Sequence, residues 1–210
     1  MQIRISSEAL RSGAERHRTI LTAIDDAASD LNAQVSLLRQ AWEGNAGAQA
    51  VQTLEEIKNY ADKLTEATGE GVNKLVGFCE AFEAIDQGEQ SAIFFRTLPT
   101  KPFINLVGCP CPTIQFPFFQ PGSVRIVPEE LRAVAAKCSA IADTYTVRAD
   151  DLRNSLQILQ NEWEGNSFNR FSEETMELVS VYTKIYEEIM GFSDRLRKAA
   201  MRYEEIDNMF

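Results

Sequence analysis

One tetrapeptide occurs twice in this 210-residue chain, and its repetition constrains the fold more than any other feature. Trp-Glu-Gly-Asn occupies positions 42–45 and again positions 163–166, 121 residues later. The same offset, without gaps, aligns Phe-Glu-Ala-Ile-Asp at 82–86 with Tyr-Glu-Glu-Ile-Asp at 203–207. A register shared over most of two segments indicates an internal duplication, so both segments are expected to form the same structural unit.

The second part of each repeat carries apolar residues spaced alternately three and four positions apart. This spacing puts them on one face of a helix and predicts a long helix buried along that face. In the first repeat the positions are Leu54, Ile57, Ala61, Leu64, Thr68, Gly71, Leu75, Phe78, Phe82 and Ile85. In the second repeat they are Thr175, Leu178, Tyr182, Ile185, Ile189, Phe192, Leu196, Ala199, Tyr203 and Ile206.

The repeats also carry signals for where helices begin and where they reverse. Ser6 is a suitable N-cap, and Pro128 is suited to a first helical turn. Gly44 and Gly165 follow the two tryptophans and supply the positive-φ freedom that a tight reversal needs. Each repeat is therefore predicted to be a helical hairpin with helices of roughly 35–40 residues, or about 50–60 Å. Because a lone hairpin leaves an apolar face uncovered, the two hairpins are expected to form an all-α four-helix bundle.

Composition argues against several classes of function. The net charge of −10 disfavours nucleic-acid binding, since phosphates would be repelled. No apolar run is long enough for a transmembrane helix, and the N-terminus does not resemble a cleavable Sec-type signal. The single histidine, His17, is expected at a surface or half-buried helical position. No phosphate loop, zinc motif or nucleophile elbow is present, so we expect no cofactor, no metal site and no enzyme activity.

At the two tryptophans the chain resembles the WXG family, small helical hairpins exported by type VII secretion systems that include the early secreted antigen proteins. Trp42-x-Gly44 and Trp163-x-Gly165 match the family's turn, and Tyr203-x-x-x-Asp207 matches its C-terminal export signal. The family's members pair as antiparallel dimers of hairpins. The resemblance therefore implies an intramolecular pseudo-dimer, a tandem fusion of two copies that is monomeric and requires no separate WXG partner.

The resemblance divides the chain into a first hairpin at 1–88, a linker at 89–123 and a second hairpin at 124–210. The linker holds most of the prolines and many aromatic residues, unlike a polar flexible tether. In an antiparallel pair the linker must travel the length of the bundle, and about 36 residues at up to ~3.3 Å each suffice. We expect it to pack along the bundle. A binding or membrane-touching loop, and redox or metal chemistry at Cys109 and Cys111, are the alternatives.

Antiparallel packing brings the end of each hairpin beside the turn of the other. The resemblance thus implies a composite export signal read by the secretion ATPase, made of Trp42, Gly44, Tyr203 and Asp207. A degenerate counterpart is expected at the other end of the bundle, made of Trp163, Gly165, Phe82 and Asp86. The alternative is structural: Tyr203 occupies a core heptad position, and either tryptophan can simply cap the bundle.

The implied function is that of a secreted substrate or co-secreted adaptor of a type VII system in a Gram-positive-type bacterium. Such a protein is made in the cytoplasm and exported without a cleavable signal peptide. One alternative is a cytoplasmic chaperone or targeting factor for a larger type VII effector or toxin. Another is a thiol-dependent redox protein, which would need exposed, reactive Cys109 and Cys111.

Overall fold

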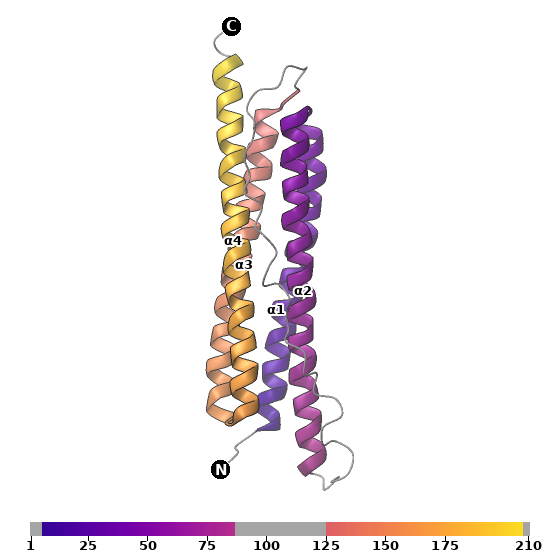
Figure 1. Cartoon of the computed structure of the whole chain (residues 1–210), viewed down its shortest axis with the longest axis vertical. Helices are drawn as coiled ribbons and strands as arrows, with labels where there is room; N and C mark the ends of the chain where they lie inside the picture. Colours follow the sequence, from indigo (N-terminus) through magenta and orange to yellow (C-terminus); the bar gives the residue numbers. More distant parts are fainter. Residues whose placement is uncertain (1–5, 87–124, 208–210) are drawn as a thin grey trace.

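The computed structural model describes residues 6–86 and 125–207, and these form four helices. The helices are α1 (Ser7–Ala41), α2 (Asn45–Asp86), α3 (Pro128–Glu162) and α4 (Asn166–Asp207). Figure 1 shows them as two hairpins, α1–α2 and α3–α4, packed side by side into one elongated bundle. The predicted all-α bundle of two hairpins is confirmed. The predicted linker at 89–123, with Cys109 and Cys111, lies outside the described residues.

The local signals in the sequence act as expected. The Ser6 side chain accepts a hydrogen bond from the Ala9 backbone N–H at 3.2 Å, and Glu8 lies in the first turn of α1. Pro128 begins α3, where its missing N–H has no cost. Gly44 and Gly165 have φ angles of 108° and 129°, a region that residues with a Cβ rarely adopt. Short reversals after Trp42 and Trp163 therefore connect the helices of each hairpin.

The two hairpins are antiparallel to each other. The Ser6 N–H donates to the Glu162 carbonyl at 3.2 Å, which ties the start of α1 to the end of α3. The Val127 N–H donates to the Ala41 carbonyl at 3.0 Å, which ties the start of α3 to the end of α1. Across the bundle α1 packs against α3 and α2 against α4, so every helix contacts two neighbours.

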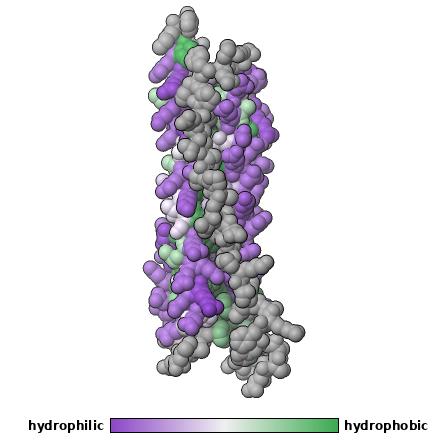
Figure 2. Space-filling view, in the orientation of Figure 1, coloured by the Kyte–Doolittle hydropathy of each residue, from purple (hydrophilic) through white to green (hydrophobic). Residues whose placement is uncertain are grey.

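Heptad positions of all four helices fill the core. In α2 and α4 the predicted stripe is buried from Leu54 to Leu75 and from Thr175 to Ala199. A polar contact crosses the middle of this core, because the Thr68 hydroxyl lies 2.9 Å from the Tyr182 hydroxyl. On the face shown in Figure 2, most of the described surface is hydrophilic, as the acidic composition requires. Within the described residues, no helix is both long and apolar enough to cross a membrane.

The prediction that the apolar stripe is buried is wrong at the last position of the stripe in α4. Ile206 is 39% exposed, although its heptad position predicts burial. Helices α2 and α4 have 42 residues and α1 and α3 have 35, so the longer helices continue for about 10 Å beyond their neighbours at 1.5 Å per residue. Figure 1 shows this overhang of α4 at one end of the bundle and of α2 at the other.

His17 is a second correction, because it is 2% exposed and neither superficial nor half-buried. Its ring centroid lies 5.9 Å from that of Phe171 in the core. Burial lowers the pKa of His17 from 6.5 to about 4, because the charged imidazolium would lose its hydration. Its counterpart in the second repeat, Cys138, is also buried, and burial raises the pKa of that thiol to about 12.

Candidate functional site: the Trp42 end

One end of the bundle, here called the Trp42 end, joins the turn of the first hairpin to the start of α3 and the end of α4. Trp42 forms an isolated antiparallel β-bridge with Ile126. Next to it, the Glu43 N–H donates to the Arg125 carbonyl at 2.8 Å. These contacts and the Val127–Ala41 hydrogen bond hold the turn against the second hairpin. The backbone around Trp42 is therefore fixed by residues more than 80 positions away.

The Trp42 side chain meets Tyr203 across the bundle. The two ring centroids are 6.1 Å apart with an interplanar angle of 79°, the edge-to-face geometry that aromatic pairs prefer. Trp42 is 4% exposed, whereas Tyr203 is half-buried. Gly47 makes this turn tight, since a Cβ there would lie 2.2 Å from the Trp42 carbonyl oxygen. The expected proximity of Trp42 and Tyr203 is thus present.

Charged side chains rim the Trp42 end. Arg132 of α3 forms an ion pair with Glu204 of α4, next in sequence to Tyr203. Arg125 and Glu43 form a longer pair at 3.5 Å, with both side chains well exposed. Exposed pairs of this kind contribute little to stability.

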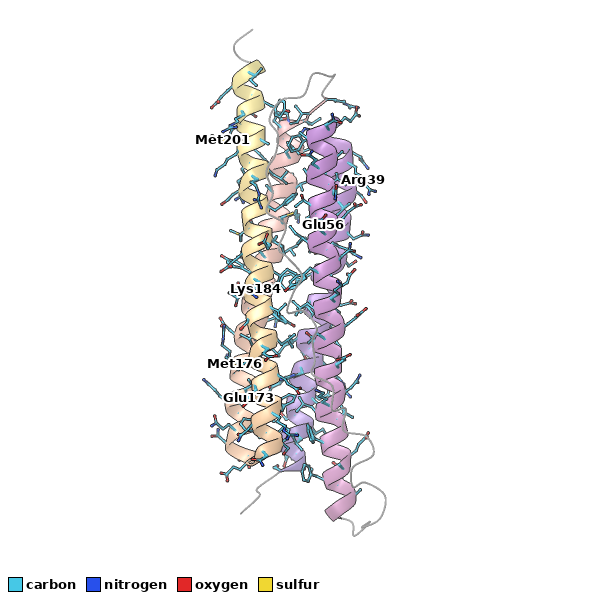
Figure 3. All side chains as sticks on the ribbon, viewed as in Figure 1. Arg39, Glu56, Glu173, Met176, Lys184 and Met201 are labelled. Atoms are coloured by element: carbon cyan, nitrogen blue, oxygen red, sulfur yellow. The ribbon has the colours of Figure 1, made fainter. Side chains whose placement is uncertain are left out.

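The last turns of α4 also carry two exposed apolar side chains close to Tyr203 in sequence. Met201 is 54% exposed, and Figure 3 shows it on the outer side of α4. Ile206 is exposed one turn further along the helix. Asp207 is the last residue of α4, and its side chain, like that of Asp86 at the end of α2, lies outside the part that the structure describes.

The opposite end, here called the Trp163 end, repeats the ion pair but not the aromatic contact. Arg11 pairs with Glu83, and these residues are the counterparts of Arg132 and Glu204. Trp163 is fully buried, and its indole N–H donates to the Ser167 hydroxyl at 3.1 Å. Its ring contacts are with phenylalanines, at centroid distances of 4.9, 5.6 and 5.6 Å to Phe78, Phe168 and Phe171.

Phe82 is half-buried and packs against the same cluster as Trp163. It holds the place that Tyr203 has at the Trp42 end. Neither the heptad stripe nor the Trp-x-Gly motif includes Phe168 and Phe171, which lie at this end. The signal that identifies them is the 121-residue offset, because their counterparts in the first repeat are the small residues Gly47 and Ala50.

No group of three or more His, Cys, Asp or Glu side chains that could hold a metal ion is found among residues 6–86 and 125–207. The two cysteines in these ranges, Cys79 and Cys138, are free and buried. The Trp42 end thus combines a buried tryptophan, a half-buried tyrosine and a rim of charged side chains.

Comparison with known proteins places this geometry in a family. Residues 2–87 and 123–208 each match WXG100, the family described as proteins of 100 residues with WXG. The chain belongs to the WXG100 family. It carries two copies, and each WXG100 match covers one of the hairpins seen in the structure. WXG100 proteins are small helical proteins associated with type VII secretion, and this chain is one of them.

A curated relative supports the same assignment. The chain is 27% identical over 86 residues to Protein YukE of Bacillus subtilis (strain 168). The matched region is 41% of this chain and 89% of the relative, so it has about the length of one WXG100 hairpin. No solved structure matches the chain.

Proposed function

We propose that this tandem WXG100 protein is a substrate or co-secreted adaptor of a type VII system, and that the secretion ATPase recognises its Trp42 end. The observation that carries the proposal is the Trp42–Tyr203 contact. It unites the Trp-x-Gly turn of one repeat with the Tyr-x-x-x-Asp segment of the other, 161 positions along the chain. Trp42, Gly44, Tyr203 and Asp207 would form the recognised surface, and the protein would be exported as a folded rod.

The two ends of the bundle differ in what they offer a partner. At the Trp42 end a half-buried tyrosine on an overhanging helix is accompanied by exposed Met201 and Ile206. At the Trp163 end the tryptophan is enclosed by phenylalanines, and Phe82 has no hydroxyl to present. This contrast favours the Trp42 end as the recognised one and Trp163, Gly165, Phe82 and Asp86 as its degenerate counterpart.

The alternative, a chaperone for a larger effector, would be favoured by a continuous apolar face. In the described part of the chain, the large exposed apolar side chains are distributed over three helices: Leu37, Val147, Ile158, Met176, Met201 and Ile206. Apolar residues scattered singly over a surface are normal for a soluble protein. The substrate or adaptor role is therefore the better supported one.

The deciding experiment compares Tyr203→Ala with Phe82→Ala in an export assay. These positions are equivalent in the two repeats, and both side chains are half-buried, so their effects on folding should be similar. We expect Tyr203→Ala to abolish ATPase-dependent appearance in the culture supernatant, and Phe82→Ala to leave it unchanged. Circular dichroism of both purified variants verifies that each bundle is folded.

Normal export of a folded Tyr203→Ala variant would refute recognition at the Trp42 end. Equal losses in both variants would show that export follows bundle integrity and not a signal at one end. Export of the wild-type chain only in complex with a larger protein would support the chaperone alternative.

A further inference from the structure

A groove of about 330 Å³ lies between α1 and α3, and the type VII role does not account for it. Its α1 side includes Asp26, Ala27, Asp30 and Gln34, and its α3 side includes Lys137 and Thr144. The volume is near the lower limit of roughly 300 Å³ for small-molecule pockets, so it suits a group the size of one side chain. The lining belongs entirely to described residues of α1 and α3, and neither turn tryptophan is part of it.

The groove presents hydrogen-bond acceptors. Gln34 is only 7% exposed, and its side-chain carbonyl oxygen has no hydrogen-bond partner among the described residues. Leaving a buried acceptor unpaired is unfavourable, so a ligand that donates a hydrogen bond to this oxygen would gain binding free energy. The carboxylates of Asp26 and Asp30 line the same groove, and neither forms a salt bridge with Lys137 or with another described cation. The groove therefore favours a cationic donor.

The second repeat shows which donor suits this position. Ala27, in the groove, corresponds to Arg148, and Asp30 corresponds to Asp151. Arg148 Nη1 donates to Asp151 Oδ2 at 2.6 Å, with the arginine side chain 29% exposed. Because the hairpins pack antiparallel, the α1 face toward α3 and the α3 face toward α1 are equivalent surfaces. In the second repeat this position carries a guanidinium hydrogen-bonded to Asp151, whereas the first repeat has an alanine beside an open groove.

We propose that the groove binds the guanidinium group of an arginine side chain presented by a partner protein. Asp30 would accept its hydrogen bonds as Asp151 accepts those of Arg148, and the Gln34 carbonyl oxygen would accept another. Ala27 leaves the space that the incoming side chain fills. A guanidinium carries five N–H donors in a planar fork and matches a carboxylate and an amide oxygen better than the compact ammonium of lysine.

The test is a titration of the full chain followed by amide chemical shifts in NMR. The probe is Nα-acetyl-arginine-N-methylamide, and the citrulline analogue, which has the same shape without the charge, is the control. We expect shifts confined to residues 23–34 of α1 and 137–144 of α3, with millimolar affinity. The citrulline analogue should bind at least tenfold more weakly.

Two substitutions, each replacing a residue by the one at the equivalent position of the other repeat, make the test more specific. Ala27→Arg places in the groove the residue that the other repeat carries, and it should remove the shifts caused by the arginine probe. Arg148→Ala should open the equivalent surface and add a second set of shifts along residues 148–155. Positions 27 and 148 are equivalent, and each variant introduces the residue that the other repeat already carries there, so both variants should fold.

Three results would overturn the proposal. One is equal binding of the arginine and citrulline probes. Another is unaltered binding by the Ala27→Arg variant. The third is tighter binding of spermidine than of the arginine probe, which would assign the groove to diffuse attraction of cations. None of these outcomes bears on export, so this proposal and the proposed function fail or survive separately.

Discussion

The buried histidine makes the stability of this bundle depend on pH in a calculable way. His17 is neutral in the folded chain, because burial lowers its pKa to about 4, whereas an unfolded histidine titrates near 6.5. Between about pH 6.5 and 4, His17 is therefore protonated in the unfolded state but stays neutral in the folded state. The stability associated with neutral His17 is complete above pH 6.5 and is lost as the pH falls from about 6.5 to about 4.

A pKa difference of about 2.5 units corresponds to a total loss of roughly 3 kcal/mol at 1.36 kcal/mol per unit. Linkage predicts that roughly half of it, between about 1 and 2 kcal/mol, occurs between pH 7.0 and 5.2, above the sequence pI of 4.7. The free energy of unfolding, measured by urea denaturation at the two pH values, is the quantity to compare. Carboxylates also titrate in this range, so the comparison needs a matched variant.

His17→Cys is that variant, because cysteine is the residue at the equivalent buried position 138. Over the same pH change, the free energy of unfolding of the variant should fall by about 1–2 kcal/mol less than that of the wild type. An independent readout is available because the chain has one histidine, so its imidazole signal in NMR is unambiguous. That signal should not titrate above about pH 5. An imidazole that titrates near 6.5 in the folded protein, or equal pH sensitivity of the two proteins, would refute the reasoning.

Three further predictions concern single positions. Gly165→Ala should lower stability by about 1–2 kcal/mol, because φ is 129° there and residues with a Cβ rarely adopt that angle. A clash is not the cause, since nothing lies within 4 Å of an added Cβ. Thermal denaturation measures the loss, and an unchanged melting temperature would contradict the backbone explanation. Gly77→Ala should raise stability by about 0.5–1 kcal/mol, since this helical glycine also has open space around it; a loss in urea denaturation would show a hidden clash. Lys74→Met should lower the free energy of unfolding by about 1–2 kcal/mol, because it removes the ammonium that lies 2.6 Å from the partly buried Glu174 carboxylate. The double variant Lys74→Met with Glu174→Gln should recover at least half of that loss.

Much of the fold could be predicted because local and periodic signals agree in both copies. Heptad spacing predicted the helices, the glycines after Trp42 and Trp163 predicted the reversals, and Ser6 and Pro128 marked two helix starts. The Trp42–Tyr203 contact was predicted from the antiparallel arrangement that the family resemblance implied. The predictions of helices, reversals and helix starts use information carried by one helix or by the shared offset.

The errors arise where a residue's environment depends on a neighbouring helix. His17 lies one heptad before Ile24 on the buried stripe of α1, but its polarity outweighed its position in the prediction. Ile206 keeps the heptad spacing, yet periodicity within α4 does not show where the neighbouring helices end. The contacts of Trp163 with Phe168 and Phe171 were not predicted, because they depend on the larger side chains that the second turn carries.

The antiparallel duplication provides an internal control for deciding which contacts hold the fold and which have diverged. Each end of the bundle combines the turn of one repeat with the tail of the other, so divergence must be compared end by end. The ion pairs Arg11–Glu83 and Arg132–Glu204 occur at both ends, which is expected of contacts that orient the same helices in the same way. The differences concentrate on the side chains around the tryptophans. The Trp163 end has four phenylalanines, Phe78, Phe82, Phe168 and Phe171. The equivalent positions at the Trp42 end hold, in the same order, Ala199, Tyr203, Gly47 and Ala50. Four differences around one side chain, with the same ion pair at both ends, mean that phenylalanines enclose the tryptophan at the Trp163 end, whereas the Trp42 end has a half-buried tyrosine.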